Sequence, residues 1–90
     1  MKTSQFNEVL GGKTHDIIAA VRSAPIEETE MGVCRVFTDG ALQWLPYASV
    51  KIAGGLVTTA CFASEEAADQ FLNYIDQLNR VEHQPLKEAA

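Results

Sequence analysis

The pattern of apolar residues along the chain is helical at both ends and alternating in the middle. Ile17 and Val21 share one face of a predicted helix that has Thr14 as its N-cap and that Pro25 prevents from continuing. From residue 33 the period changes to two, as it does in a strand, over residues 33–38, and further strand-like segments follow as far as residue 62. A helical period then returns. The order helix, strands, helix predicts an α+β domain.

The central part predicts an antiparallel meander of three or four strands. The first strand ends at Asp39-Gly40, the pair that favours a tight type I′ turn, so a hairpin is expected here. In the return strand Pro46 predicts an edge, a bulge or a short break. Gly54-Gly55 predicts a second turn before the uncharged strand 56–62. An uncharged edge invites pairing with another chain, so we expect this strand to be central, covered or used in a homodimer.

The C-terminal helix is the most regular element of the pattern. Ser64 is suited to be its N-cap, and the acidic residues that follow favour the positive end of a helix. Its opposite side is polar and predicted to stay in solvent. An apolar stripe predicts packing on the sheet through Ala68, Phe71, Leu72, Ile75 and Leu78.

The remaining segments predict little regular structure. Phe6, Val9 and Leu10 have the spacing of one short helical turn. Residues 26–30 contain three glutamates and are interpreted as an exposed connection between the helical and the β portion. All 90 residues are expected to form a single domain, 1–90, in which residues 1–13 and 82–90 are less ordered.

Composition and charge narrow the functional classes. With 47% hydrophobic residues the chain can fold around its own core without a cofactor. Its formal net charge of -5 disfavours direct binding to nucleic acid and is compatible with a protein partner that has a basic surface. We find neither an apolar run of about 18 residues, as a membrane span needs, nor a signal peptide, so a cytoplasmic location is expected.

No complete catalytic or metal-binding motif is visible. Gly12-Lys13-Thr14 matches only the end of a phosphate-binding loop, because Asn7 stands where the first glycine should be. Cys34 and Cys61 lie in strand-like sequence and are interpreted as reduced, buried thiols. A metal would have to recruit ligands from distant segments, without a local pair. The sequence therefore predicts no cofactor, no metal and no catalytic residue.

The candidate partner-binding residues fall in two segments. One holds the only Trp and a Tyr beside a strand-breaking Pro, and such aromatic residues often anchor protein interfaces. Trp44 has two open interpretations, a core residue or an interface residue. The other segment is the acidic side of the last helix. The proposed partner-binding set is Leu42, Trp44, Tyr47, Glu66, Asp69, Asn73 and Asp76.

Two functional hypotheses follow from this pattern. The first is a small acidic protein-binding or regulatory module, an inhibitor or accessory factor of the kind that phages and mobile elements encode, which acts through surface recognition. The alternative is a small dimeric enzyme or ligand-binding protein with a pocket between sheet and helices, for which His15, Arg35 and Tyr47 are the first suspects. A deep pocket that holds these residues would favour the second hypothesis, and a flat surface around Trp44 the first.

Overall fold

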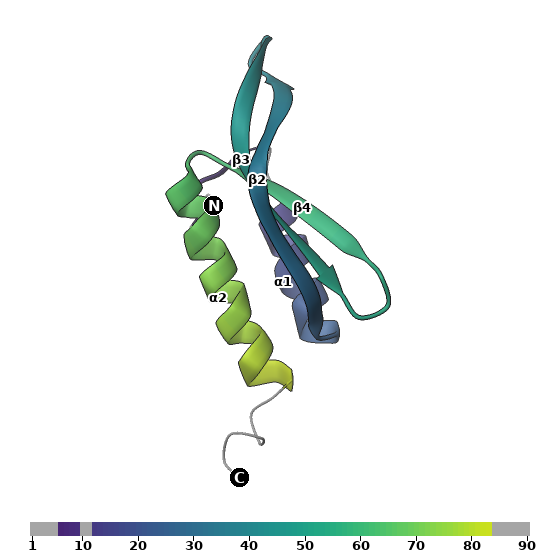
Figure 1. Ribbon diagram of the computed structural model, residues 1–90. Coiled ribbons are helices and arrows are strands. Elements are labelled where there is room, and N and C mark those ends of the chain that lie inside the picture. The colour runs from purple at the N-terminus through teal and green to yellow at the C-terminus, as the bar shows by residue number, and fades with distance from the viewer. Residues whose placement is uncertain (1–5, 10–11, 84–90) are drawn as a thin grey trace.

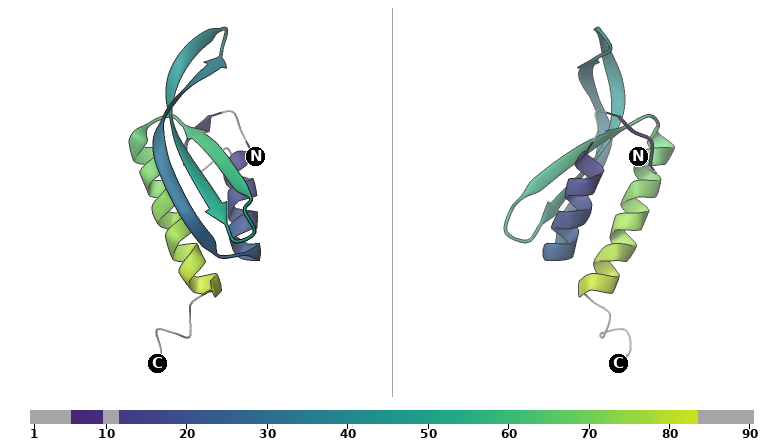
Figure 2. Two further views of the ribbon diagram at one scale, coloured as in Figure 1. Left: turned by 45° about the vertical axis from the view of Figure 1, so that its right-hand side comes forward. Right: turned by 180° about the vertical axis from the view of Figure 1, so that it is seen from behind.

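The computed structural model describes residues 6–9 and 12–83. The strands form one antiparallel sheet in the order β1-β4-β3-β2. Both helices lie on the same face of this sheet (Figures 1 and 2), so the predicted α+β fold is confirmed. In chain order the elements are β1 (Glu8–Val9), α1 (Lys13–Ser23), β2 (Ile26–Thr38), β3 (Ala41–Ile52), β4 (Val57–Phe62) and α2 (Glu65–His83).

The hydrophobic core lies between the sheet and the two helices. The predicted stripe of α2 is confirmed at its centre, because Phe71 and Ile75 are completely buried. The ring of Phe71 packs against that of Phe62, with 5.4 Å between ring centroids. The other members of the core come from α1, β3, β4 and the first turn of α2: Ile17, Val21, Ala48, Val50, Ile52, Ala60, Ala67 and Ala68.

A carboxylate from β1 caps the first helix. The backbone N–H groups of Lys13 and Thr14 donate to Oε2 of Glu8 at 2.7 and 3.2 Å, and the Thr14 hydroxyl donates to Oε1 at 2.6 Å. This anion sits at the positive end of the helix dipole. The prediction that Thr14 is the N-cap is wrong: Gly12 occupies that position, and Thr14 is a buried residue of the first turn.

The segment before α1 is extended and not helical. Glu8 and Val9 pair with Phe62 and Cys61 of β4, so the expected helical turn over Phe6, Val9 and Leu10 is wrong where it can be seen. Leu10 lies outside the described residues. The edge of β4 offers backbone partners to this segment, and such a tertiary contact overrides a weak local spacing.

The glutamate-rich segment also differs from its prediction. Residues 26–30 are the first part of β2 and pair with β3 as far as Ile26↔Ile52, so they are not a connection. Because β2 is the edge of the sheet, its charged side chains remain in water, which also protects the edge from pairing with another chain. The predicted hairpin turn is confirmed, with positive φ angles of 55° at Asp39 and 78° at Gly40.

The hairpin of β2 and β3 extends well beyond the helices. Pairing of β3 with β4 ends at Tyr47↔Cys61, so beyond this point the sheet has only two strands. Pro46 stands where the third strand ends. We call residues 33–46 the arm; Figure 1 shows it projecting past the N-terminal end of α2. The molecule measures 52 × 27 × 21 Å, so it is elongated.

The C-terminal end of α2 is tied to α1. A ring nitrogen of His83 lies 2.6 Å from the carbonyl oxygen of Val21, to which it can donate. Residues 82–83, which were expected to be less ordered, belong to the last turn of α2. The other expected less ordered residues 1–5, 10–11 and 84–90 lie outside the described residues. In the part of the chain that the structure describes, neither helix has the length and apolar character that a bilayer crossing needs.

Candidate functional site

One face of the arm is apolar and exposed. Side chains alternate along a strand, and residues paired across an antiparallel ladder share a face. The pairs Phe37↔Leu42 and Arg35↔Trp44 therefore lie on the face that carries the core residues further along β3. The helices cover this face only beside the core. We call the exposed apolar side chains on this side of the hairpin the arm face: Val33, Phe37, Leu42 and Trp44 of the arm, and Met31, which precedes the arm in β2.

Trp44 lies in the middle of the arm face. Its side chain is 67% exposed, so its interpretation as a core residue is wrong. The reason is geometric. Pairing of β4 with β3 stops at Tyr47↔Cys61, and the arm projects past the N-terminal end of α2 (Figure 1), so neither element covers Trp44. The Arg35 guanidinium lies 5.8 Å from the centroid of the Trp44 ring, a cation–π contact between the two strands of the arm.

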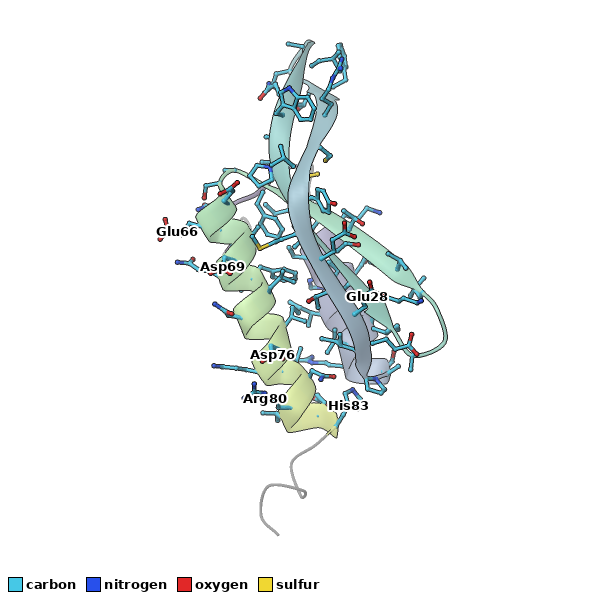
Figure 3. All side chains as sticks on the ribbon, in the orientation of Figure 1. Glu28, Glu66, Asp69, Asp76, Arg80 and His83 are labelled. Carbon is cyan, nitrogen blue, oxygen red and sulfur yellow. The ribbon has the colours of Figure 1, made fainter. Side chains whose placement is uncertain are left out.

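The predicted partner-binding residues do not form one surface. Leu42 and Trp44 belong to the arm face, whereas Tyr47 projects to the other face of the sheet, which we call the open face because no helix covers it. The acidic residues are exposed on α2 together with Asn73. Figure 3 shows Glu66 and Asp69 in the part of α2 nearest the arm and Asp76 near its far end.

Tyr47 has a structural role on the open face. Its hydroxyl donates to the carboxylate of Glu30 at 2.9 Å, and this hydrogen bond is the main reason why the pKa of Tyr47 is raised. The ring lies over Gly32, its partner in β2: a Cβ at that position would be 2.9 Å from the ring. Glycine therefore allows Tyr47 to lie flat against the base of the arm.

The two cysteines meet at the same place. Cys34 of β2 and Cys61 of β4 are free thiols with 3.9 Å between their sulfur atoms. Burial, and then the hydrogen bond to Cys34, raise the pKa of Cys61 to about 11. At neutral pH this thiol is protonated and therefore a poor nucleophile.

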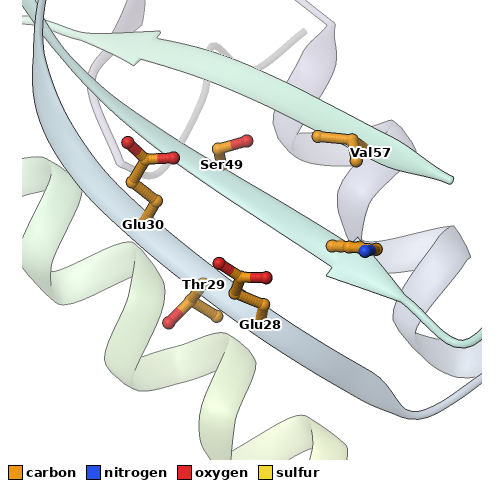
Figure 4. A pocket seen from close by; sticks show the side chains of 6 residues that line it. Glu28, Thr29, Glu30, Ser49 and Val57 are labelled. Atoms are coloured by element: carbon orange, nitrogen blue, oxygen red, sulfur yellow. The ribbon is translucent and has the colours of Figure 1, made fainter. Parts of the chain in front are cut away.

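Two surface hollows lie beside β2. The first is on the open face, between β2, β3 and the start of β4 (Figure 4), and is lined by Glu28, Thr29, Glu30, Ser49, Lys51 and Val57. The second separates the start of β2 from the middle of α2. Neither contains the residues suspected in the enzyme hypothesis. His15 lies exposed on α1, Arg35 on the arm and Tyr47 on the open face, so the structure does not bring these three together.

Sequence reasoning missed three of the five residues of the arm face. Val33 and Phe37 were expected to be strand residues only, and Met31 was not assigned to any element, yet all three complete the exposed apolar surface. A signal for them exists, because a two-residue turn at Asp39-Gly40 fixes the register and places Phe37 opposite Leu42. What the pattern alone lacks is the point at which the third strand stops pairing.

Within residues 6–9 and 12–83 there is no group of three or more His, Cys, Asp or Glu side chains that could hold a metal ion. No protein-family model, no curated protein and no solved structure matches this chain. The surfaces of the molecule itself therefore carry the functional inference.

Proposed function

We propose that this chain is a protein-binding module whose contact surface is the arm face. The observation that carries the proposal is the exposure of five large apolar side chains on one side of a projecting hairpin. Contiguous apolar surfaces of this kind are uncommon on proteins that act alone, and they mark sites of association. A regulatory protein that works by covering part of its partner needs only such a surface.

The residue types fit a protein partner. Trp44 and Phe37 are aromatic anchors on a paired β-ribbon, so little side-chain freedom is lost on binding. Burying each would contribute about 1.5–3 kcal/mol. The arm holds a single basic residue, Arg35, whereas nucleic-acid binding needs many phosphate contacts.

The acidic side of α2 would act at the border of this contact. Glu66 and Asp69 are exposed in the part of the helix nearest the arm, and the chain as a whole has a net charge of -5. A partner with basic residues beside an apolar centre would be attracted by these carboxylates, chiefly through a faster association rate. The arm face supplies most of the binding energy in this proposal.

The enzyme hypothesis has weaker support. An active site needs groups that converge on one place, and the three suspects are distributed over α1, the arm and the open face. The thiol of Cys61, the nucleophile type most readily activated, has a raised pKa. Surface recognition therefore agrees better with the geometry.

Photo-crosslinking from the arm tests the proposal. Benzoylphenylalanine is placed at position 37 or 42 of the full chain, and at position 81 as a control, since Val81 is as exposed as Phe37 but lies on α2. In host lysate, irradiation should yield protein adducts from both arm positions and few from position 81. Mass spectrometry identifies them. A lack of adducts from the arm, or equal adducts from position 81, would contradict the proposed function.

A further inference from the structure

We infer that the protein seated on the arm face is a second copy of this chain, so that two arms pack face to face in a homodimer. The inference rests on the proposed function and names the partner for the same surface. Three properties of the arm lead to it: the area of its apolar face, its charge and the lack of cover over its two strands.

The exposed area matches what a small dimer needs. At their exposed fractions the five side chains of the arm face present on the order of 600 Å² per chain, since a large aromatic side chain offers about 150–250 Å² in full. Two copies in contact would thus bury on the order of 1,200 Å², the lower limit for specific interfaces. The apolar face of one copy also supplies the apolar surface that the other requires.

The charges of the arm permit this contact. Although the chain carries a net charge of -5, residues 33–46 contain one cation, Arg35, and one anion, Asp39. The arm as a whole is therefore neutral. Arg35 lies on the same face as Trp44, with its guanidinium 5.8 Å from the centroid of that ring, so a symmetric contact brings one such cation–π pair from each copy to the interface. The carboxylates of this chain that could attract a strongly basic partner lie on α2 and in the first part of β2, away from the centre of the arm face.

The arm lacks a covering layer of its own. From Val33↔Pro46 to Thr38↔Ala41 it has two strands only, and an isolated two-stranded ribbon is marginally stable in water. In a two-fold arrangement each arm would cover the apolar face of the other, because a symmetric contact uses the same patch on both copies. A single contact would thus remove the arm faces of both copies from water.

Sedimentation of the full chain over a range of concentrations tests the inference. The wild-type chain should pass from 9.8 kDa to twice that mass as concentration rises. Phe37→Lys and Leu42→Lys should each weaken self-association by roughly 30-fold or more, as loss of an interface anchor does. Val81→Lys is the matched control, since Val81 has the same 67% exposure as Phe37 and should leave the dimer intact. Circular dichroism verifies that the variants are folded.

Other outcomes separate this inference from the proposed function. A chain that stays at 9.8 kDa at every concentration overturns the homodimer; the proposed function then stands if the arm crosslinks to another protein in lysate, and fails as well if it does not. A dimer that survives Phe37→Lys and Leu42→Lys, or that dissociates with Val81→Lys, uses a different surface and also overturns the inference.

Discussion

Single polar residues fix how the sheet and the helices meet. The clearest case is Asn79, which is buried in α2 and whose side-chain oxygen accepts a hydrogen bond from the backbone N–H of Ile26 at 3.0 Å. This bond holds the first residue of β2 against the last helix. It links two segments that are 53 residues apart in the chain, so no local pattern could have indicated it.

Removal of this side chain should destabilise the fold. In Asn79→Ala the N–H of Ile26 loses its partner at a partly buried position, so we expect the free energy of unfolding to fall by about 1–3 kcal/mol. Denaturation in urea measures it. The matched control is Asn73→Ala, an exposed change on the same helix that should stay within about 0.5 kcal/mol. Equal losses in the free energy of unfolding for Asn79→Ala and Asn73→Ala would show that the hydrogen bond to Ile26 does not stabilise the fold.

Two groups on the open face, Cys61 and Tyr47, should make the folded protein less stable at alkaline pH. Burial and the bond to Cys34 raise the pKa of Cys61 from 9.0 to about 11, and the bond to Glu30 raises that of Tyr47 above its ordinary 10.0. Both groups hold their protons more tightly when folded. Their contribution to stability is therefore present below pH 9.0 and is lost as the pH rises toward 11 and beyond.

The measurement is the urea midpoint at a series of pH values. As the pH is raised from 9.0 to 11, the urea concentration at which half of the wild-type chain is unfolded should decrease. The decrease should be smaller in the double variant Tyr47→Phe with Cys61→Ala. An unchanged slope in the double variant would mean that other groups, outside this face, cause the alkaline loss of stability.

At the scale of elements, α2 is the part on which the core depends. Phe71 is completely buried between the rings of Phe62 and Phe6, at centroid distances of 5.4 and 5.1 Å. Phe71→Ala should lower the free energy of unfolding by about 3–5 kcal/mol, because it removes buried surface and leaves a cavity. Gln77→Ala, on the solvent side of α2, should change it by less than about 0.5 kcal/mol. A small effect at Phe71 in urea denaturation would contradict this packing.

The elements that sequence predicted correctly are those with a strong local cause. The apolar stripe of α2 and the turn at Asp39-Gly40 both depend on residues close together in the chain. The wrong predictions concern tertiary partners. The segment before α1 became β1 because the edge of β4 lies beside it, and residues 26–30 became a strand because β3 continues as far as Ile52. Glutamates are compatible with an edge strand, although their charge suggested a loop.

The candidate site was predictable only in part, for a similar reason. Leu42 and Trp44 were recognised from their residue types. Tyr47 lies three positions after Trp44 in β3, and because side chains alternate along a strand it faces the other side of the sheet. Whether Trp44 is covered depends on where β4 stops pairing, which is a property of the whole sheet. Phe37 joins the site only through the hairpin register.

At the scale of the whole molecule, the protein has a packed body and a projecting arm with different tasks. The body holds the core residues, and the arm holds four of the large apolar side chains that remain in water, Val33, Phe37, Leu42 and Trp44. A change in the arm should therefore affect association more than folding. Trp44→Ala is expected to change the free energy of unfolding by less than about 1 kcal/mol, the size of an exposed cation–π contact, as urea denaturation would show.

The most direct measurement uses Trp44 itself, because it is the only tryptophan in the chain. Acrylamide quenching of its fluorescence reports whether the arm face is open to solvent. We predict strong quenching at high dilution and progressively weaker quenching as the concentration rises and the second copy covers the ring, with Phe37→Lys strongly quenched throughout. Strong quenching of the wild-type chain at every concentration would contradict self-association, and weak quenching of the dilute monomer would contradict an exposed arm face.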